Sequence, residues 1–213
     1  MLVNGFQQIR RVLLLGAHAD DIEIGCGGTL LRLIEERPDV EVTWIAFSGE
    51  GPRRAEAEKS AGLFLRQAVG PRVELLDFPD RLFPTVWQPI KDRFDALRDD
   101  FAPDLILTHC RDDAHQDHRV IGELTWCTFR DHWIWEYEIP KYEGDLGSPN
   151  VFVPLTAAIL QRKIANLHAA FATQAAKPWF LPETFSGLAH LRGLECRAPE
   201  NVAEAFHARK MVF

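Results

Sequence analysis

The chain has 213 residues, of which 46% are hydrophobic and 26% charged, and its formal net charge is −7. This composition is typical of a globular protein with room for a sizeable core, and we expect a single domain over residues 1–213. The acidic balance argues against a nucleic-acid partner, because a phosphate backbone requires a basic face. No apolar run approaches the roughly 20 residues that span a bilayer, so we expect no membrane span.

The start of the chain and its cysteines favour a cytoplasmic location. The apolar run Val12–Leu15 is too short for the hydrophobic region of a secretory signal, and no cleavage site follows it. The four cysteines are widely spaced and form no C-x-x-C pair. This spacing suits free thiols in a reducing compartment better than a disulfide framework.

Strand and helix patterns alternate along the first half of the chain. Apolar runs predict strands at 11–15, 41–48, 73–78 and 104–109. Helical spacing predicts helices at 29–36, 53–69 and 90–101. Such alternation calls for right-handed βαβ units, so we expect an α/β fold with a Rossmann-like, mostly parallel sheet and helices on both faces.

The second half of the chain carries fewer clear patterns. Residues 120–130 and 156–174 predict helices, and residues 141–150 predict a loop. Between them, Trp133, Trp135 and Tyr137 share one side of a strand at 132–139, and we expect this aromatic side to pack in the core. After Pro178 we expect irregular chain and a short final unit at 202–206.

Two clusters of metal-capable side chains follow predicted buried strands. The first is the run His18-Ala19-Asp20-Asp21, and the second is the run D-A-H-Q-D-H at 113–118. Parallel topology places both loops at the same edge of the sheet. Two histidines and a carboxylate can supply three ligands and leave a fourth position for water, as catalytic zinc sites do. The sequence therefore predicts a catalytic metal beside a carboxylate base, but adjacency alone does not assign the roles of Asp20 and Asp21.

Both clusters match the motifs of a known family. The run AHADDIEIGCGGTL at 17–30 resembles the A-H-P-D-D-x-E-x-G-x-G-G-T signature of the PIG-L/LmbE-like N-acetylglucosaminyl deacetylases. The run D-A-H-Q-D-H is similar to that family's second motif, D-x-H-x-D-H, and weaker matches extend from about residue 12 to 206. Ala19 and Gln116 stand where the family usually has proline, and Arg81 stands where glycine is common.

The resemblance implies metal ligands and a base. It implies that His18, Asp21 and His118 bind zinc and that Asp20 is the general base. Ligand types alone do not separate Zn²⁺ from Fe²⁺, so either ion fits the expectation.

The resemblance also implies roles for two more residues of the second motif. His115 would stabilise the tetrahedral intermediate and could also be the acid for the leaving amine. Asp117 would hold His115 through a carboxylate–imidazole hydrogen bond. The expected function is a zinc-dependent hydrolase that removes an N-acetyl or other N-acyl group from a small-molecule amino sugar or glycoconjugate. The sequence leaves open whether the enzyme is a homo-oligomer.

Two other functions stay open at this point. A non-haem Fe(II) oxygenase could use two histidines and one carboxylate, although its usual jelly-roll scaffold does not match the alternating pattern. A non-enzymatic carbohydrate-binding module could use the aromatic strand. A dinucleotide loop is excluded, because Leu30 occupies the third glycine position of G-x-G-x-x-G.

Three further features carry weaker expectations. The glycines Gly25, Gly27 and Gly28 are expected to permit tight turning and close packing. Glu23 is expected at the start of a helix or behind the site. His109 could cap a strand end or contact substrate, and the sequence does not decide between them.

Overall fold

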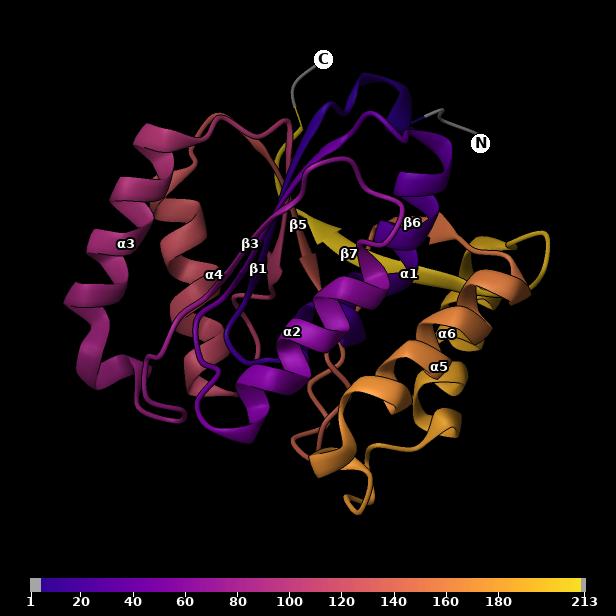
Figure 1. Ribbon diagram of the computed structural model, residues 1–213. Helices are drawn as coiled ribbons and strands as arrows, with labels where there is room; N and C mark the ends of the chain where they lie inside the picture. The colour runs from indigo at the N-terminus through magenta and orange to yellow at the C-terminus, as the bar shows by residue number, and fades with distance from the viewer. Residues whose placement is uncertain (1–4, 212–213) are drawn as a thin grey trace.

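A seven-stranded sheet forms the centre of the computed structural model, which describes residues 5–211 (Figure 1). Its strand order is β3-β2-β1-β4-β5-β7-β6. Five neighbouring strands are parallel: β3 (Arg72–Leu75), β2 (Glu41–Ala46), β1 (Arg11–Gly16), β4 (Leu105–His109) and β5 (Trp133–Tyr137). The strand β7 (Ala203–Ala208) runs antiparallel to both β5 and β6 (Val151–Pro154). The predicted mostly parallel α/β fold is confirmed.

Helices cover both faces of the sheet (Figure 1). One face carries α3 (Trp87–Asp100) and α4 (Gln116–Thr128). The other carries α1 (Asp21–Glu36), α2 (Pro52–Phe64), α5 (Ala157–Ala170) and α6 (Pro182–Cys196). Short 3₁₀ helices lie at Gly5–Gln8, Phe83–Val86 and Ala172–Gln174. Within residues 5–211, no helix combines the length and the apolar character needed to cross a bilayer.

The strand β1 shows why the apolar runs are continuous. Val12 and Leu14 belong to the core on the α1 side of the sheet, whereas Leu13 and Leu15 belong to the core on the α3–α4 side. Successive side chains of a strand point to opposite faces, so a strand covered on both faces needs apolar residues at every position.

The helix α1 begins at Asp21 rather than at Thr29, where the apolar spacing placed its start. Its glycines allow close packing: a Cβ on Gly25 would lie 2.2 Å from the Tyr137 ring, and a Cβ on Gly27 would lie 2.6 Å from Phe64. The expected close packing is therefore confirmed. The expected tight turn at these glycines is wrong, because packing against the core outweighs the weak helix propensity of glycine.

The expectation of irregular chain after Pro178 is also wrong, because residues 182–196 form α6. The buried side of this helix contains Phe185 and Ala189 but also Arg192, which interrupts the apolar pattern. The Arg192 guanidinium is buried because it forms two hydrogen bonds, at 2.8 and 2.6 Å, with the Glu138 carboxylate beyond β5. A charged residue thus occupies a core position that a hydrophobic pattern cannot reveal.

A buried ion pair joins α1 to α5 and β7. Lys163 of α5 donates to Glu204 of β7 at 2.5 Å and to the carbonyl oxygen of Ile24 at 2.7 Å. The Glu204 carboxylate accepts the backbone N–H groups of Gly28 and Thr29 at 2.8 and 2.6 Å. In a regular α-helix the Gly28 N–H would donate to the Ile24 carbonyl oxygen, so the ion pair binds both groups of one helical hydrogen bond. The ion pair therefore fixes α1 against α5 and β7.

Substitution of Lys163 should destabilise the protein strongly. We expect Lys163→Met to lower the free energy of unfolding by about 3 kcal/mol, because Glu204 would stay buried without its cation. Denaturation with urea measures this change. The neighbouring Arg162 forms an exposed pair with Glu35 at 2.7 Å, and Arg162→Met should cost less than about 1 kcal/mol. Equal effects of the two substitutions would contradict a role for the buried pair.

Candidate active site

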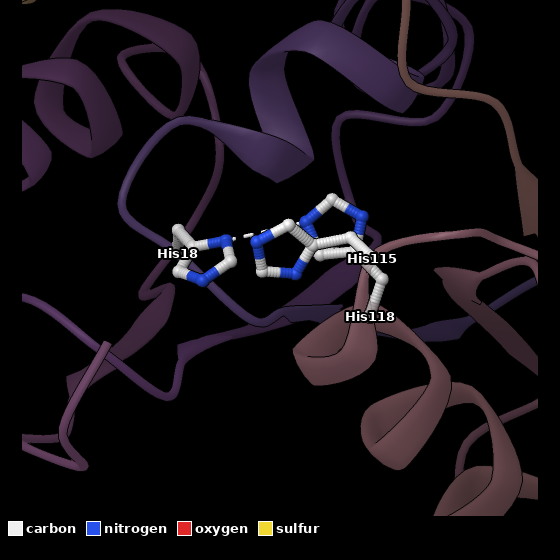
Figure 2. A group of neighbouring side chains, drawn as sticks. All are labelled: His18, His115 and His118. Atoms are coloured by element: carbon white, nitrogen blue, oxygen red, sulfur yellow. Dashed lines mark hydrogen bonds between the residues drawn. The ribbon is translucent and has the colours of Figure 1, made fainter. Parts of the chain in front are cut away.

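The two predicted clusters meet at the carboxyl ends of β1 and β4. His18 lies in the turn between β1 and α1, and His115 and His118 lie where the loop after β4 enters α4. Because β1 and β4 are adjacent and parallel, both loops leave the same edge of the sheet. Figure 2 shows the three imidazoles side by side, with a dashed contact between His18 and His118. The structure thus brings the two clusters together, as the topology predicts.

Three side chains place ligand atoms within 3.5 Å of one another. His18 Nδ1 lies 3.2 Å from His118 Nε2 and 3.2 Å from Asp21 Oδ2. His118 Nε2 lies 3.5 Å from Asp21 Oδ1. In a tetrahedral zinc site with bonds of about 2.0–2.1 Å, neighbouring ligand atoms are about 3.3 Å apart. The two imidazole nitrogens therefore have the spacing of neighbouring ligands in such a site, and each lies close to a different oxygen of the Asp21 carboxylate.

Carboxylates hold the other nitrogen of both imidazoles. His18 Nε2 lies 3.2 Å from Asp117 Oδ2 and 3.1 Å from Asp80 Oδ1, and His118 Nδ1 lies 3.0 Å from Asp113 Oδ2. A carboxylate at the outer nitrogen keeps the proton there and leaves a lone pair on the inner nitrogen. Two such lone pairs beside the Asp21 carboxylate repel one another unless a cation lies between them. The site therefore fits a proton or a divalent metal ion.

When no metal is bound, a proton on His18 can supply the positive charge that the site needs. Burial opposes protonation of His18, but the Asp21 charge and hydrogen bonds with Asp117 and Asp80 outweigh it and raise the pKa of His18 well above its usual value. Burial and the neighbouring His109 lower the pKa of His118. A protonated His18 and a neutral His118 can then share one proton across the 3.2 Å contact. A metal ion that binds here has to displace this proton.

Comparison with known proteins agrees with this geometry. A family model described as GlcNAc-PI de-N-acetylase, PIG-L, matches residues 13–129. The chain belongs to the PIG-L family. Its part beyond residue 129 holds α5, α6 and the antiparallel strands.

Solved structures share the whole fold of this PIG-L family member. N,N'-diacetylchitobiose deacetylase from Pyrococcus horikoshii has a TM-score of 0.71 at 20% identity, over 98% of this chain and 86% of that one. The conserved protein TT1542 from Thermus thermophilus has a TM-score of 0.72 at 19% identity, over 97% of each chain. GalB, the 4-carboxy-2-hydroxymuconate hydratase from Pseudomonas putida KT2440, has a TM-score of 0.70 at 17% identity, over 96% of this chain and 98% of that one. One fold thus carries a deacetylase and a hydratase, and the fold alone does not choose the reaction.

Asp117 has different partners from those that the family resemblance implies. Its carboxylate accepts the backbone N–H groups of Arg81 and Phe83, at 2.6 and 3.1 Å, and contacts His18. His115 instead caps α4, because its Nδ1 accepts the backbone N–H of Asp117 at 3.3 Å. The carboxylate–imidazole contact of Asp117 is therefore made with His18, and the expectation that it is made with His115 is wrong.

The capping role of His115 fixes its tautomer. A neutral imidazole whose Nδ1 accepts a hydrogen bond carries its proton on Nε2. Burial lowers the pKa of His115, and the nearby His118 and His18 lower it further. His115 is therefore a neutral residue that can donate from Nε2.

Asp20 lies at the N-cap position of α1, immediately before Asp21. Its buried carboxylate pairs through Oδ1 with Arg53 Nη2 of α2 at 2.6 Å. Arg53 also pairs with Glu56 at 3.1 Å, and its guanidinium lies 5.2 Å from the centre of the Phe171 ring. The arginine therefore holds one oxygen of Asp20 in place, and a carboxylate held in this way can take a proton on the other oxygen.

His109 lies beside the site, with its Nε2 3.1 Å from Asp21 Oδ2. It is the last residue of β4 and is fully buried, and its Nε2 accepts the backbone N–H of Ala17 at 2.9 Å. Its ring stacks on that of His118, with centroids 3.9 Å apart and an interplanar angle of 20°. The sequence left open whether His109 caps a strand end or contacts substrate, and its complete burial fits the role at the strand end.

Two charged residues outside both motifs reach the site from other loops, and sequence reasoning missed the first of them. Asp80, in the loop after β3, contacts His18. Lys141, in the loop after β5, donates to Asp113 at 2.9 Å and to Asp145 at 2.6 Å. Both loops follow parallel strands and leave the sheet at the same edge as the two motifs. That position in the predicted topology could have indicated that their charged residues reach the site. Glu23, expected at a helix start, lies buried in the first turn of α1.

We expect Asp113→Asn to weaken binding of divalent metal about 10- to 100-fold, because an amide holds the proton on His118 Nδ1 less strongly than a carboxylate does. Titration against a chromogenic chelator measures the affinity. Asp112 is a matched control, because its exposed carboxylate pairs with Arg209 at 2.7 Å. Asp112→Asn should leave the affinity within about twofold of the parent. Unchanged affinity in the Asp113 variant would contradict the assigned role.

Proposed function

We propose that this protein is a metal-dependent N-deacetylase that releases acetate from an amino sugar or glycoconjugate. The observation that carries the proposal is the convergence of His18, Asp21 and His118 beside the buried carboxylate of Asp20. Membership in a family described as GlcNAc-PI de-N-acetylase supports the choice of reaction. The fold shared with N,N'-diacetylchitobiose deacetylase is consistent with it.

We propose His18, Asp21 and His118 as the metal ligands and Zn²⁺ as the resident ion, with Fe²⁺ as the alternative that the same ligands accept. Bound there, the ion would lower the pKa of water to about 7 and polarise the amide carbonyl. This proposal is supported by Asp117, Asp80 and Asp113, which contact the outer nitrogens of the two imidazoles and orient the rings.

The remaining steps fall to residues of the chain. In the proposed mechanism Asp20 takes the proton from the attacking water, while Arg53 keeps the carboxylate in position. The Nε2–H of His115 donates to the oxygen on which negative charge develops. The proton on Asp20 is then available to the leaving amine, which departs as the C–N bond breaks.

The two other functions find no support in the fold. The oxygenase hypothesis is tied to a jelly roll, whereas residues 5–211 form a mostly parallel sheet with helices on both faces. The carbohydrate-binding hypothesis needs an exposed aromatic strand. Trp135 and Tyr137 are 7% and 0% exposed, and the Tyr137 hydroxyl donates to the carbonyl oxygen of Leu15 at 2.7 Å. This strand therefore packs in the core, as expected.

Substitution of Asp20 tests the proposed base. Asp20→Asn should lower the rate of acetate release from N-acetylated glucosamine derivatives by about 10²- to 10⁴-fold, because an amide cannot accept the proton. Metal content, measured by elemental analysis, should be unchanged. Asp39→Asn is the control, because Asp39 is exposed and pairs with the nearby Arg37 at 3.0 Å, away from the site. Parental activity in the Asp20 variant would refute its role.

Metal binding should release about one proton per ion at pH 7, because the pKa of His18 is raised whereas His118 is already neutral. Affinity should therefore rise with pH until the pH exceeds the raised pKa of His18, and should then level off. Calorimetric titration in buffers of different ionisation enthalpy counts the protons. Binding without proton release at pH 7 would contradict this electrostatic description of the site.

A further inference from the structure

The helix α6 presents leucines on the outside of the molecule. It lies at the margin of the fold beside α5 (Figure 1). Its side toward the core contains Phe185 and Ala189 but also the buried Arg192. Its outer side contains Leu191 and Leu194, which are 47% and 70% exposed. A surface helix normally turns polar residues toward the solvent, so the two exposed leucines need an explanation of their own.

Gly187, Leu191 and Leu194 lie along one line on the outer side of α6, which we call the α6 seam. Residues at spacings of four and three share a face of an α-helix, and the seam spans about 10 Å along the axis. A Cβ on Gly187 would have no atom within 4 Å, so the space outside this residue is open. The seam thus has a low point at Gly187 and a projecting side chain at Leu194, two turns farther along.

Opposite charges lie at the two ends of the α6 seam. Glu183 is in the first turn of α6, and Arg197 follows the last residue of the helix. The spacing between them is close to four helical turns, so both lie on the same side of the helix. Both residues are exposed, and within residues 5–211 neither has an ion-pair partner at 4.0 Å or less. The fold of one chain therefore leaves both charges available to a partner.

These charges complement a second copy of α6 in one orientation. In an antiparallel pair, Glu183 of each copy lies near the partner's Arg197, whereas a parallel pair would bring like charges together. The macrodipoles of antiparallel helices also oppose each other favourably. The same arrangement sets each Leu194 against the partner's Gly187, where no side chain blocks it. Shape and charge therefore favour the same antiparallel contact.

We propose that α6 forms the interface of a homodimer, in which two copies of the helix pack antiparallel about a two-fold axis near Leu191. The contact is the same in both directions, as a two-fold interface requires. Removal of Leu191 and Leu194 from water stabilises the dimer. This inference concerns assembly and does not depend on the proposed function.

The length of α6 sets the expected strength of the dimer. A helix of 15 residues is about 22 Å long, so one helix pair makes a small interface. Small interfaces are typical of weak association, and we expect a Kd of about 1–100 μM.

Sedimentation velocity of the full chain, at concentrations that bracket the expected Kd, measures the dimer. The parent should pass from monomer to dimer as the concentration rises. Leu194→Glu should raise the Kd at least about tenfold, because it buries a charge against the partner's Gly187. Val69→Glu is the matched control, because Val69 is 71% exposed and lies between α2 and β3, at the opposite edge of the sheet. It should leave the Kd within about twofold of the parent. Both variants should keep the parental Tm, because both positions are exposed.

An exchange of charges tests the antiparallel arrangement separately. Glu183→Arg and Arg197→Glu should each raise the Kd about threefold or more, because like charges then meet at both ends of the interface. The double variant should restore the parental Kd. A double variant at least as weak as the single variants would overturn the arrangement, because the two residues would then not meet. A parent that stays monomeric, which would leave the seam to a different protein, or a dimer that Leu194→Glu leaves intact would overturn the proposal itself.

Discussion

The structure depends on one electrostatic constraint, the close approach of two imidazole nitrogens and a carboxylate. His18 Nδ1, His118 Nε2 and the oxygens of Asp21 lie within 3.5 Å of one another in a buried setting. Such an arrangement of lone pairs is unfavourable without a cation, and each imidazole is turned inward by a carboxylate at its outer nitrogen. Folding thus brings together groups that lack a compensating positive charge, at a cost in stability. This pattern is expected of a functional site.

The rest of the fold holds these groups in place. Asp21 is the first residue of α1 and accepts the backbone N–H of His18 at 2.6 Å, so the turn and the helix N-terminus together fix its carboxylate. Farther along, the close packing of Gly25 on Tyr137 and the Lys163–Glu204 pair set the position of α1 against the sheet. A shift of α1 would move Asp21 away from both histidines, so the packing of this helix serves the geometry of the site.

Much of this could be predicted from the sequence, because the relevant signals are local. A buried strand followed by His18 and Asp21, and a second followed by His118, require only strand periodicity and parallel topology to converge. The helix α6 could not be found in this way, because Arg192 occupies its buried side and is neutralised by Glu138, far away in the chain. The contact of Asp117 with His18 was equally hidden, because it depends on the loop after β3, which binds the same carboxylate through Arg81 and Phe83. Contacts between loops are set by tertiary structure and leave little trace in local pattern.

The central claim is that one divalent ion binds between His18, Asp21 and His118. Anomalous diffraction from zinc-loaded crystals, recorded above and below the zinc absorption edge, tests it most directly. We predict one strong peak about 2.0–2.2 Å from His18 Nδ1, from an Asp21 oxygen and from His118 Nε2. A peak bound instead by His109, or by Asp80 and Asp117 on the other side of His18, would contradict it, as would the absence of any peak at the site.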